Sequence, residues 1–305
     1  MKTGTLLRST PNGVASEDTC LHENGWRFLL IDAMRLATRN YAGPLSEDRL
    51  FGWHAALFPT GRSGMRKIAV GAWRPPEVGP MQVVSGPLGR EKVHFEAPEA
   101  SRLSGEMNAF LDWFNSDPQT GPVIRAALAH FWFVTIHPFE DGNGRIARAI
   151  ADMALARSDG TAQRFYSMSA QIEAERNEYY SVLEQSQKGD LNVTTWLTWF
   201  IACLGRSLDR AEDTLAAVLH KAQVWRHVGA AGVNDRQRKV INRLLDGFEG
   251  KLSSSKYAKL TRCSSDTALR DIRDLLDRGI LIRNPGGGRS VSYQIAEPSV
   301  GPIRE

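Results

Sequence analysis

The strongest constraint on the fold is a run from Val123 to Ile136 that is apolar on nearly every side of a helix. Such a helix must be buried all round, so other helices have to surround it. The run is interrupted by His130 and Thr135, and it is too short to cross a bilayer. The run therefore predicts the central helix of a mostly α-helical bundle, and we expect no membrane association.

Helical spacing recurs on both sides of this run. A first apolar face starts at Trp26, and a second helix is expected from Ser46, with Leu50, Trp53, His54 and Leu57 on one side. Further helical stretches are predicted near 103–114, 143–157, 171–187 and 194–228. Between these helices, Met81–Ser85 and Lys92–Phe95 are short β-like runs separated by Gly86-Pro-Leu-Gly89, which predicts one β-hairpin.

The C-terminal part differs in charge and in pattern. The whole chain has a net charge of +4, but residues 236–293 alone hold 13 basic and 6 acidic side chains. Three short helices (236–247, 253–260, 265–278) precede two β-like runs around Gly286-Gly-Gly288, which is typical of a winged helix-turn-helix. The local basic excess favours an anionic partner such as DNA. A protein-docking or dimer module is the alternative.

Cysteine usage and the N-terminus bear on the cellular compartment. The three cysteines are widely spaced, so neither a disulfide framework nor a thiolate zinc site is expected. No apolar signal segment stands at the N-terminus. These features predict a cytoplasmic protein.

The stretch His137-Pro-Phe-Glu-Asp-Gly-Asn-Gly-Arg-Ile-Ala-Arg148 carries the chemistry. Pro138 should end the preceding helix, and the next helix should begin near Asn143 with its free N–H groups facing the turn. Two arginines three residues apart suit a polyphosphate beside such a helix N-terminus. A carboxylate can hold Mg²⁺ against phosphate oxygens, and a histidine can take a proton from a hydroxyl near neutral pH.

This stretch resembles, position for position, the motif H-P-F-x-D-G-N-G-R-x-x-R of the Fic (Fido) family. The resemblance extends to the hairpin at 81–95, which is similar to the family's target-docking flap. It implies a mostly α Fic helical bundle with a β-hairpin flap, here followed by the C-terminal winged helix-turn-helix. The implied domains are an N-terminal arm and helix shortened relative to the family (1–45), a Fic catalytic core (46–205), a connecting helix and linker (206–232), a winged-helix domain (233–296) and a tail (297–305).

The resemblance also implies transfer of AMP from ATP to a Tyr, Ser or Thr hydroxyl of a protein target, and the chain itself is one candidate target. His137 would be the general base, and Asp141 would bind Mg²⁺. The implied ATP-binding residues are Asp141, Gly142, Asn143, Gly144, Arg145, Arg148, Tyr179 and Tyr180, and the implied flap residues that dock the target are Val83, Val84 and Gly86. Phe139 would anchor the loop in the core.

Two alternatives to AMP transfer stay open. One is Fic-type transfer of UMP, phosphate or phosphocholine, and the other is a DNA-binding regulator whose core senses nucleotide. A protein target is the expected partner, and DNA or a second copy of the chain are further hypotheses. Many Fic proteins carry an inhibitory pattern [S/T]-x-x-x-E-[G/N], which Thr19–Asn24 matches, so Glu23 could pair with Arg148. The rival interpretation is a chance match in a truncated, less restrained enzyme.

Overall fold

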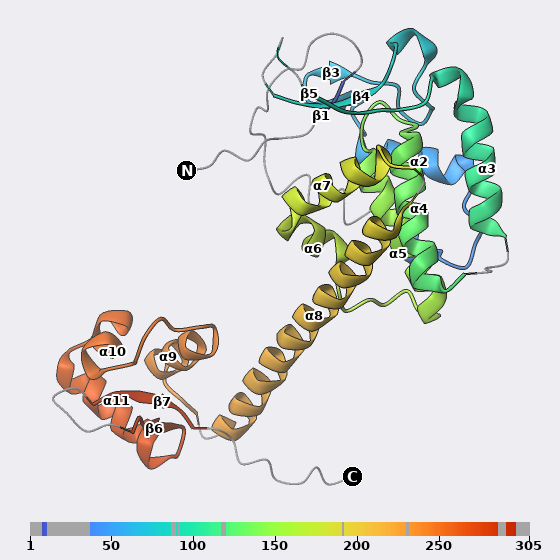
Figure 1. Cartoon of the computed structure of the whole chain (residues 1–305). Helices are drawn as coiled ribbons and strands as arrows, with labels where there is room; N and C mark the ends of the chain where they lie inside the picture. The colour runs from blue at the N-terminus through green and yellow to red at the C-terminus, as the bar shows by residue number, and fades with distance from the viewer. Residues whose placement is uncertain are drawn as a thin grey trace. The chain divides into compact units, whose positions relative to one another are not determined.

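The computed structural model describes residues 8–10, 37–86, 90, 92–116, 120–190, 192–229, 232–285 and 291–296, with the backbone alone at 8–10. The chain separates into two compact units, Met1–Ala211 and Glu212–Glu305, here called the N-terminal and the C-terminal unit (Figure 1). Glu23, most of the helix expected from Trp26, and the Gly286–Arg289 turn lie outside the described residues.

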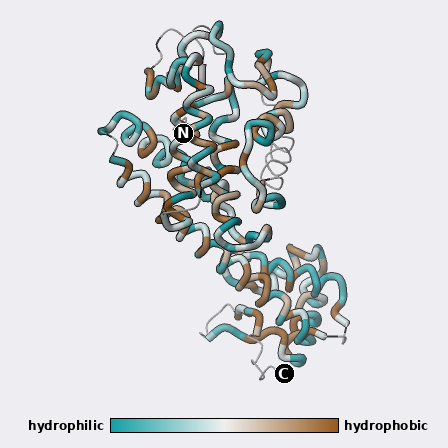
Figure 2. Tube along the Cα trace, turned by 90° about the vertical axis from the view of Figure 1, so that its right-hand side faces the viewer, coloured by the Kyte–Doolittle hydropathy of each residue, from teal (hydrophilic) through white to brown (hydrophobic). Residues whose placement is uncertain are grey.

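The N-terminal unit is mostly helical, as its sequence predicts. Its helices are α2 (Glu47–Leu57), α3 (Leu103–Asn115), α4 (Pro122–Ile136), α5 (Asn143–Asp159), α6 (Met168–Ala174), α7 (Arg176–Gln187) and the first part of α8 (Thr194–Val228), with short 3₁₀ turns at Pro76–Val78 and Ala100–Arg102. Figure 1 shows α4 and α5 side by side in the middle of this unit. Figure 2 shows hydrophobic residues, in brown, at intervals along the trace of the chain.

Helix α2 forms where the spacing predicts it. The Ser46 side chain accepts the N–H of Arg49, which caps the first turn, and two acidic residues in that turn suit the positive end of the helix dipole. The four buried residues are Leu50, Trp53, His54 and Leu57, the face that the sequence predicted.

Helix α4 is the predicted central helix. It begins after Gly121 with a proline at its first position, where a missing N–H costs nothing. It ends at Ile136, because His137 adopts a left-handed backbone conformation and Pro138 follows. Eight of its fifteen residues are buried, Ala126, Phe133 and Ile136 among them, while Ile124 near its start is 37% exposed.

The predicted helix at 171–187 is interrupted. Glu175 leaves the helical region (φ −106°, ψ 24°) and separates α6 from α7. Its carboxylate accepts two hydrogen bonds from Arg206, at 2.5 and 2.6 Å, and one from Gln171. The residue that joins α6 to α7 therefore contacts a residue of α8 that lies 31 positions away in sequence. Local helical spacing does not predict such a contact.

The predicted hairpin is present, and an additional strand joins it. Strand β4 (Gln82–Ser85) pairs antiparallel with β5 (Lys92–Glu96), with a register shift between Val83 and Val84. On the other side of β4 lies β1 (Arg8–Thr10), which gives the order β1-β4-β5 (Figure 1). A second small hairpin, β2 (Arg62–Ser63) with β3 (Arg66–Lys67), was also not predicted.

The C-terminal unit has the predicted order of elements. The end of α8 is followed by α9 (Asp235–Leu245), α10 (Ser254–Thr261), α11 (Ser265–Asp277), β6 (Leu281–Arg283) and β7 (Tyr293–Ile295), and the two strands pair antiparallel. Side chains of Asn234, Ser253 and Ser264 cap the three short helices. Val240, Tyr257 and Leu275 are fully buried between them. Within the described part of the chain, no helix has both the length and the apolar character needed to span a membrane.

Candidate functional site in the loop between α4 and α5

His137 sits in a backbone conformation that few residues other than glycine adopt. Its φ of 53° and ψ of 56° place it in the left-handed region, and its N–H donates to the Phe133 carbonyl at 3.1 Å. Buried Arg74 fixes this turn: its Nε donates to the His137 carbonyl at 2.9 Å and its backbone N–H to the Pro138 carbonyl at 2.8 Å. A strained residue held by its surroundings is common at functional sites.

The imidazole of His137 is held as a neutral base. Nδ1 lies 3.2 Å from the Val134 carbonyl oxygen, which can only accept, so Nδ1 carries the proton and Nε2 the lone pair. Burial lowers the pKa of His137 to about 4; Arg74 acts in the same direction, while the Val134 carbonyl and Asp141 oppose it. At neutral pH the ring is therefore uncharged and able to accept a proton.

Asn143 and Phe139 give the loop its shape. The Asn143 side chain accepts the Phe139 N–H at 2.9 Å and donates to the Phe139 carbonyl at 2.8 Å. The Phe139 ring is fully buried, as the sequence predicted for an anchor. Both polar atoms of the buried Asn143 side chain thus bond the Phe139 backbone and fix the loop just before α5.

His54 supports the same loop, a role that sequence reasoning missed. Its ring stacks on Phe139 at 4.1 Å between centroids with 6° between planes. Its Nδ1 accepts the Gly71 N–H and its Nε2 donates to the Asp141 carbonyl, each at 3.2 Å. Burial lowers the pKa of His54 to about 4, in keeping with an Nδ1 that already faces a donor. The sequence feature that could have revealed this role is a histidine on the predicted buried face of α2.

The loop carboxylates have well-defined partners. Asp141 Oδ1 accepts the Gly142 N–H at 2.5 Å and lies 3.6 Å from Arg145 Nη2, while its Oδ2 accepts from Ser63. Buried Glu140 accepts from Arg66 at 2.8 Å and from the Ala69 N–H at 2.9 Å. The β2–β3 hairpin supplies Ser63 and Arg66, which the sequence did not single out.

The N-terminus of α5 is arranged as an anion site. Gly142 precedes it with a φ of 85°, and the first N–H groups of a helix have no acceptor within that helix. Arg145 lies over the Phe58 ring at 4.7 Å. Arg148 Nε is buried without a hydrogen-bond partner, and no carboxylate in the described ranges lies within 4 Å of that side chain. A guanidinium nitrogen that is buried without a partner is stabilised by an incoming anion.

The two tyrosines of α7 differ in exposure. Tyr179 is 3% exposed, packs against Trp196 and Trp199, and its hydroxyl lies 3.1 Å from His130 Nε2. His130 is thus a core histidine. Tyr180 stays partly exposed. Of the two predicted nucleotide contacts, only Tyr180 presents appreciable surface.

The flap is fastened to α7 by a chain of hydrogen bonds that was not predicted. Ser85 Oγ donates to His94 Nε2 at 2.5 Å, and His94 Nδ1 donates to Glu184 Oε2 at 2.5 Å. Val84 is 3% exposed, and Gly86 has a φ of 106° that favours glycine at the turn. These bonds hold the β5 side of the flap against the helical bundle.

A magnesium site was predicted at Asp141. Among the described residues, no cluster of three or more His, Cys, Asp or Glu side chains could hold a metal by itself. Mg²⁺ is commonly bound by one or two carboxylates together with substrate phosphates, and a single partly exposed carboxylate beside the anion site fits that mode. The donor set therefore suits a metal that arrives with a nucleotide.

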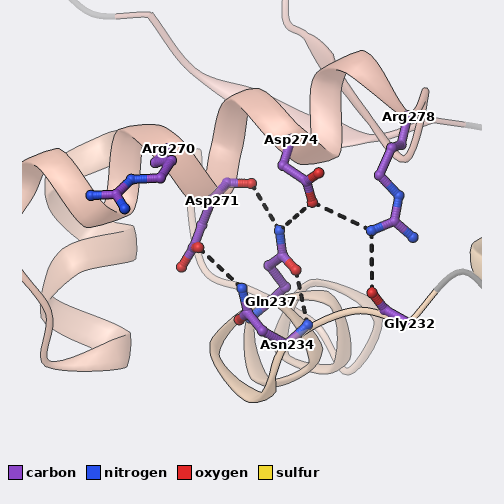
Figure 3. A pocket seen from close by; sticks show the side chains of 7 residues that line it. All are labelled: Gly232, Asn234, Gln237, Arg270, Asp271, Asp274 and Arg278. Atoms are coloured by element: carbon purple, nitrogen blue, oxygen red, sulfur yellow. Dashed lines mark hydrogen bonds and ion pairs between the residues drawn. The ribbon is translucent and has the colours of Figure 1, made fainter.

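A polar pocket of the C-terminal unit was examined as a second site (Figure 3). It is lined by Gly232, Asn234, Gln237, Arg270, Asp271, Asp274 and Arg278. Most of these side chains bond one another: Gln237 donates to Asp274 at 2.7 Å, and Asn234 donates to Asp271 at 3.1 Å. The network joins α9 to α11 and is best explained as structural.

Gly142 and Gly144 form a matched pair for testing the loop. A Cβ on Gly142 would lie 2.9 Å from Phe58 Cε2 at a φ of +85°, whereas one on Gly144 would meet only Arg148 Nη1 at 3.7 Å. We expect Gly142→Ala to lower the free energy of unfolding by about 2–4 kcal/mol, from left-handed strain and overpacking. Gly144→Ala should leave it unchanged or raise it slightly. Denaturant unfolding measures both, and equal stability of the two variants would contradict this account.

Comparison with known proteins agrees with these observations. Residues 44–155 match the model of the Fic/DOC family. A protein adenylyltransferase Fic from Nematostella vectensis is 36% identical over 114 residues, which cover 37% of this chain and 25% of that protein. Protein adenylyltransferase fic-1 from Caenorhabditis elegans is 31% identical over 129 residues, which cover 42% of this chain and 23% of that protein. The chain thus matches about a quarter of the length of these curated relatives.

One solved structure supports the fold. A Fic domain-containing signaling protein from Bacteroides thetaiotaomicron superposes with a TM-score of 0.50 at 22% identity, covering 66% of this chain and 75% of that chain. This likeness concerns the arrangement of the helices alone.

Proposed function

We propose that this chain, whose residues 44–155 are a Fic/DOC family domain, is a protein adenylyltransferase that transfers AMP from ATP to a hydroxyl side chain of a protein. One observation carries the proposal. A neutral histidine base (His137) and a partly buried arginine whose Nε is buried without a hydrogen-bond partner (Arg148) flank the same helix N-terminus. A base beside an anion site is what activation of a hydroxyl toward a phosphate ester requires.

In the proposed reaction the target hydroxyl oxygen attacks the α-phosphorus of ATP. Its proton passes to His137 Nε2, the new O–P bond forms in line with the breaking bond, and pyrophosphate leaves. His137 Nδ1–H remains on the Val134 carbonyl, which keeps the ring oriented throughout. Positioning and charge stabilisation supply most of the rate in such transfers.

The phosphates would lie at the N-terminus of α5. Backbone N–H groups of Gly142, Asn143 and Gly144 would cradle them, and Arg145 and Arg148 would hold the outer phosphates. Asp141 would hold Mg²⁺, which neutralises phosphate charge when bound. Tyr180 would border the adenosine. The edge of β4, with Val83, Val84 and Gly86, would align an extended target segment by strand addition.

The test is incubation of the full chain with Mg²⁺ and ATP labelled at the α-phosphate, with cell lysate as the source of targets. Label on protein that is lost with EDTA and in the His137→Ala variant supports AMP transfer. Label only from γ-labelled ATP would instead indicate phosphate transfer, and label only from UTP would indicate UMP transfer. Absence of label from every donor would contradict the proposal.

A specific observation also favours DNA as a partner of the C-terminal unit. On α11 the exposed Arg270 and Arg273 stand among the exposed Asp266, Asp274 and Asp277, while Asp271 is buried and paired with Arg236 at 2.7 Å. The basic excess of this unit therefore comes from residues beside α11. Lys251, Lys256, Lys259 and Arg283 are exposed as well. We propose that this unit binds DNA through α11 and the neighbouring basic residues.

For this second proposal, the Arg270→Ala/Arg273→Ala variant should bind duplex DNA more weakly. If each arginine contacts one phosphate, the slope of log K against log salt should fall by about 1.8. Gel shifts over a salt series with the promoter DNA of this gene measure the slope. Glu249→Ala is a control on the same unit, since it removes an acidic charge instead. No shift at low salt would favour a protein-docking module.

A further inference from the structure

Strand β1 occupies the edge of the flap. It pairs antiparallel with β4 in the register Arg8↔Val84, Ser9↔Val83 and Thr10↔Gln82. The opposite edge of β4 is already paired with β5. Both edges of β4 are therefore filled by strands of the same chain, and one of these comes from a segment 72 positions or more away in sequence.

The two edges are not equally replaceable. The pairing with β5 joins strands that lie close together in sequence, Gln82–Ser85 and Lys92–Glu96, and it is fastened by the Ser85–His94–Glu184 chain of hydrogen bonds. The pairing with β1 is only three residues long. Since each backbone hydrogen bond contributes about 0.5–1.5 kcal/mol net, so short a strand can be displaced by another extended segment. The exchangeable edge of the flap is thus the one that β1 covers.

We propose that residues 8–10 are an intramolecular competitor for the flap, so that an extended target segment binds only after this strand leaves β4. The inference rests on the proposed function, in which the same edge of β4 docks the target. Tethering raises the effective concentration of the competitor without any additional contact. The apparent affinity for a target segment is reduced by the fraction of molecules in which the edge is open.

The proposal is tested with backbone variants of the full chain. Ser9→Pro/Thr10→Pro removes two consecutive N–H groups. In an antiparallel strand, one of every two consecutive N–H groups faces the neighbouring strand, so this variant removes one that faces β4. Ser9→Ala/Thr10→Ala is the matched control, because it removes the hydroxyl groups and keeps both N–H groups. The probe is a fluorescein-labelled synthetic peptide with the sequence of residues 5–13, followed by fluorescence anisotropy.

If the strand covers the edge in nine of ten molecules, the proline variant should bind the peptide about tenfold more tightly than the native chain. The alanine variant should bind like the native chain. In the proline variant the β4 amides should also exchange faster with deuterium. Equal exchange of the β4 amides in the native and proline chains would overturn the proposal, whatever the peptide does.

These measurements need neither ATP nor transfer. If the proline variant gains peptide affinity while no chain labels protein from ATP, the strand covers the edge and only the proposed enzymatic function fails. If AMP is transferred but the three chains bind peptide equally, only the competitor fails.

Discussion

Replacing His137 with alanine is expected to lower the rate of AMP transfer by about 10²–10⁴-fold while leaving ATP affinity nearly unchanged. The factor is typical of removing a positioned general base. The variant keeps Asp141, Arg145 and Arg148, which are the groups that would hold the nucleotide. The loss should therefore appear in kcat, and equilibrium binding of labelled ATP should separate it from collapse of the loop.

The pH dependence sharpens this test. With its pKa lowered to about 4, His137 already carries its lone pair throughout the neutral range. The rate of the native chain should then be flat between about pH 6 and 8, without the inflection near 6.5 that an unperturbed histidine would give. Transfer unchanged in His137→Ala, or a clear inflection near pH 6.5, would contradict the assignment.

The second large effect expected is a steep loss of stability of the N-terminal unit in mild acid. Burial lowers the pKa of His54 and His137 to about 4 and that of His130 to about 3. In the unfolded chain each takes up a proton as pH falls through about 6.5, so the stability gained from keeping them neutral is present above 6.5 and lost toward pH 4. Asp152 acts oppositely, since burial raises its pKa to about 6.

Near pH 5 the unfolded chain therefore binds about two more protons than the folded chain. The free energy of unfolding should fall by about 2.7 kcal/mol per pH unit there, because one proton corresponds to about 1.36 kcal/mol per unit. Denaturant unfolding followed by tryptophan fluorescence measures it, since Trp53, Trp196 and Trp199 are in this core.

Two variants should change this slope in opposite directions. His130→Leu removes one of the groups that takes up a proton on unfolding. It should therefore reduce the slope by about 1.36 kcal/mol per pH unit, the equivalent of one proton. Asp152→Asn removes the opposing group and should increase it by about the same amount. A slope that neither variant moves would show that other groups govern the acid sensitivity.

Local sequence patterns predicted the helices well where burial is decided by spacing. The four buried residues of α2, the start of α5 at Asn143 and the extent of α8 follow from helical periodicity, from a capping serine and from glycine and proline at the loop. The break at Glu175 was missed because local spacing does not mark it; the Glu175 carboxylate is bonded to Arg206 on another helix.

The candidate site shows the same division. The sequence by itself determined the groups that we propose for the reaction, since His137, Asp141, Arg145 and Arg148 fall within twelve consecutive residues and need only a helix start to converge. The tertiary structure decided how they are held: His54, Ser63 and Arg74 reach the loop from 63 to 87 positions away. The tertiary structure also buries Tyr179 and pairs Arg8–Thr10 with strand β4 of the flap. These features depend on contacts between distant segments, and such contacts leave no periodic trace in the residues that make them.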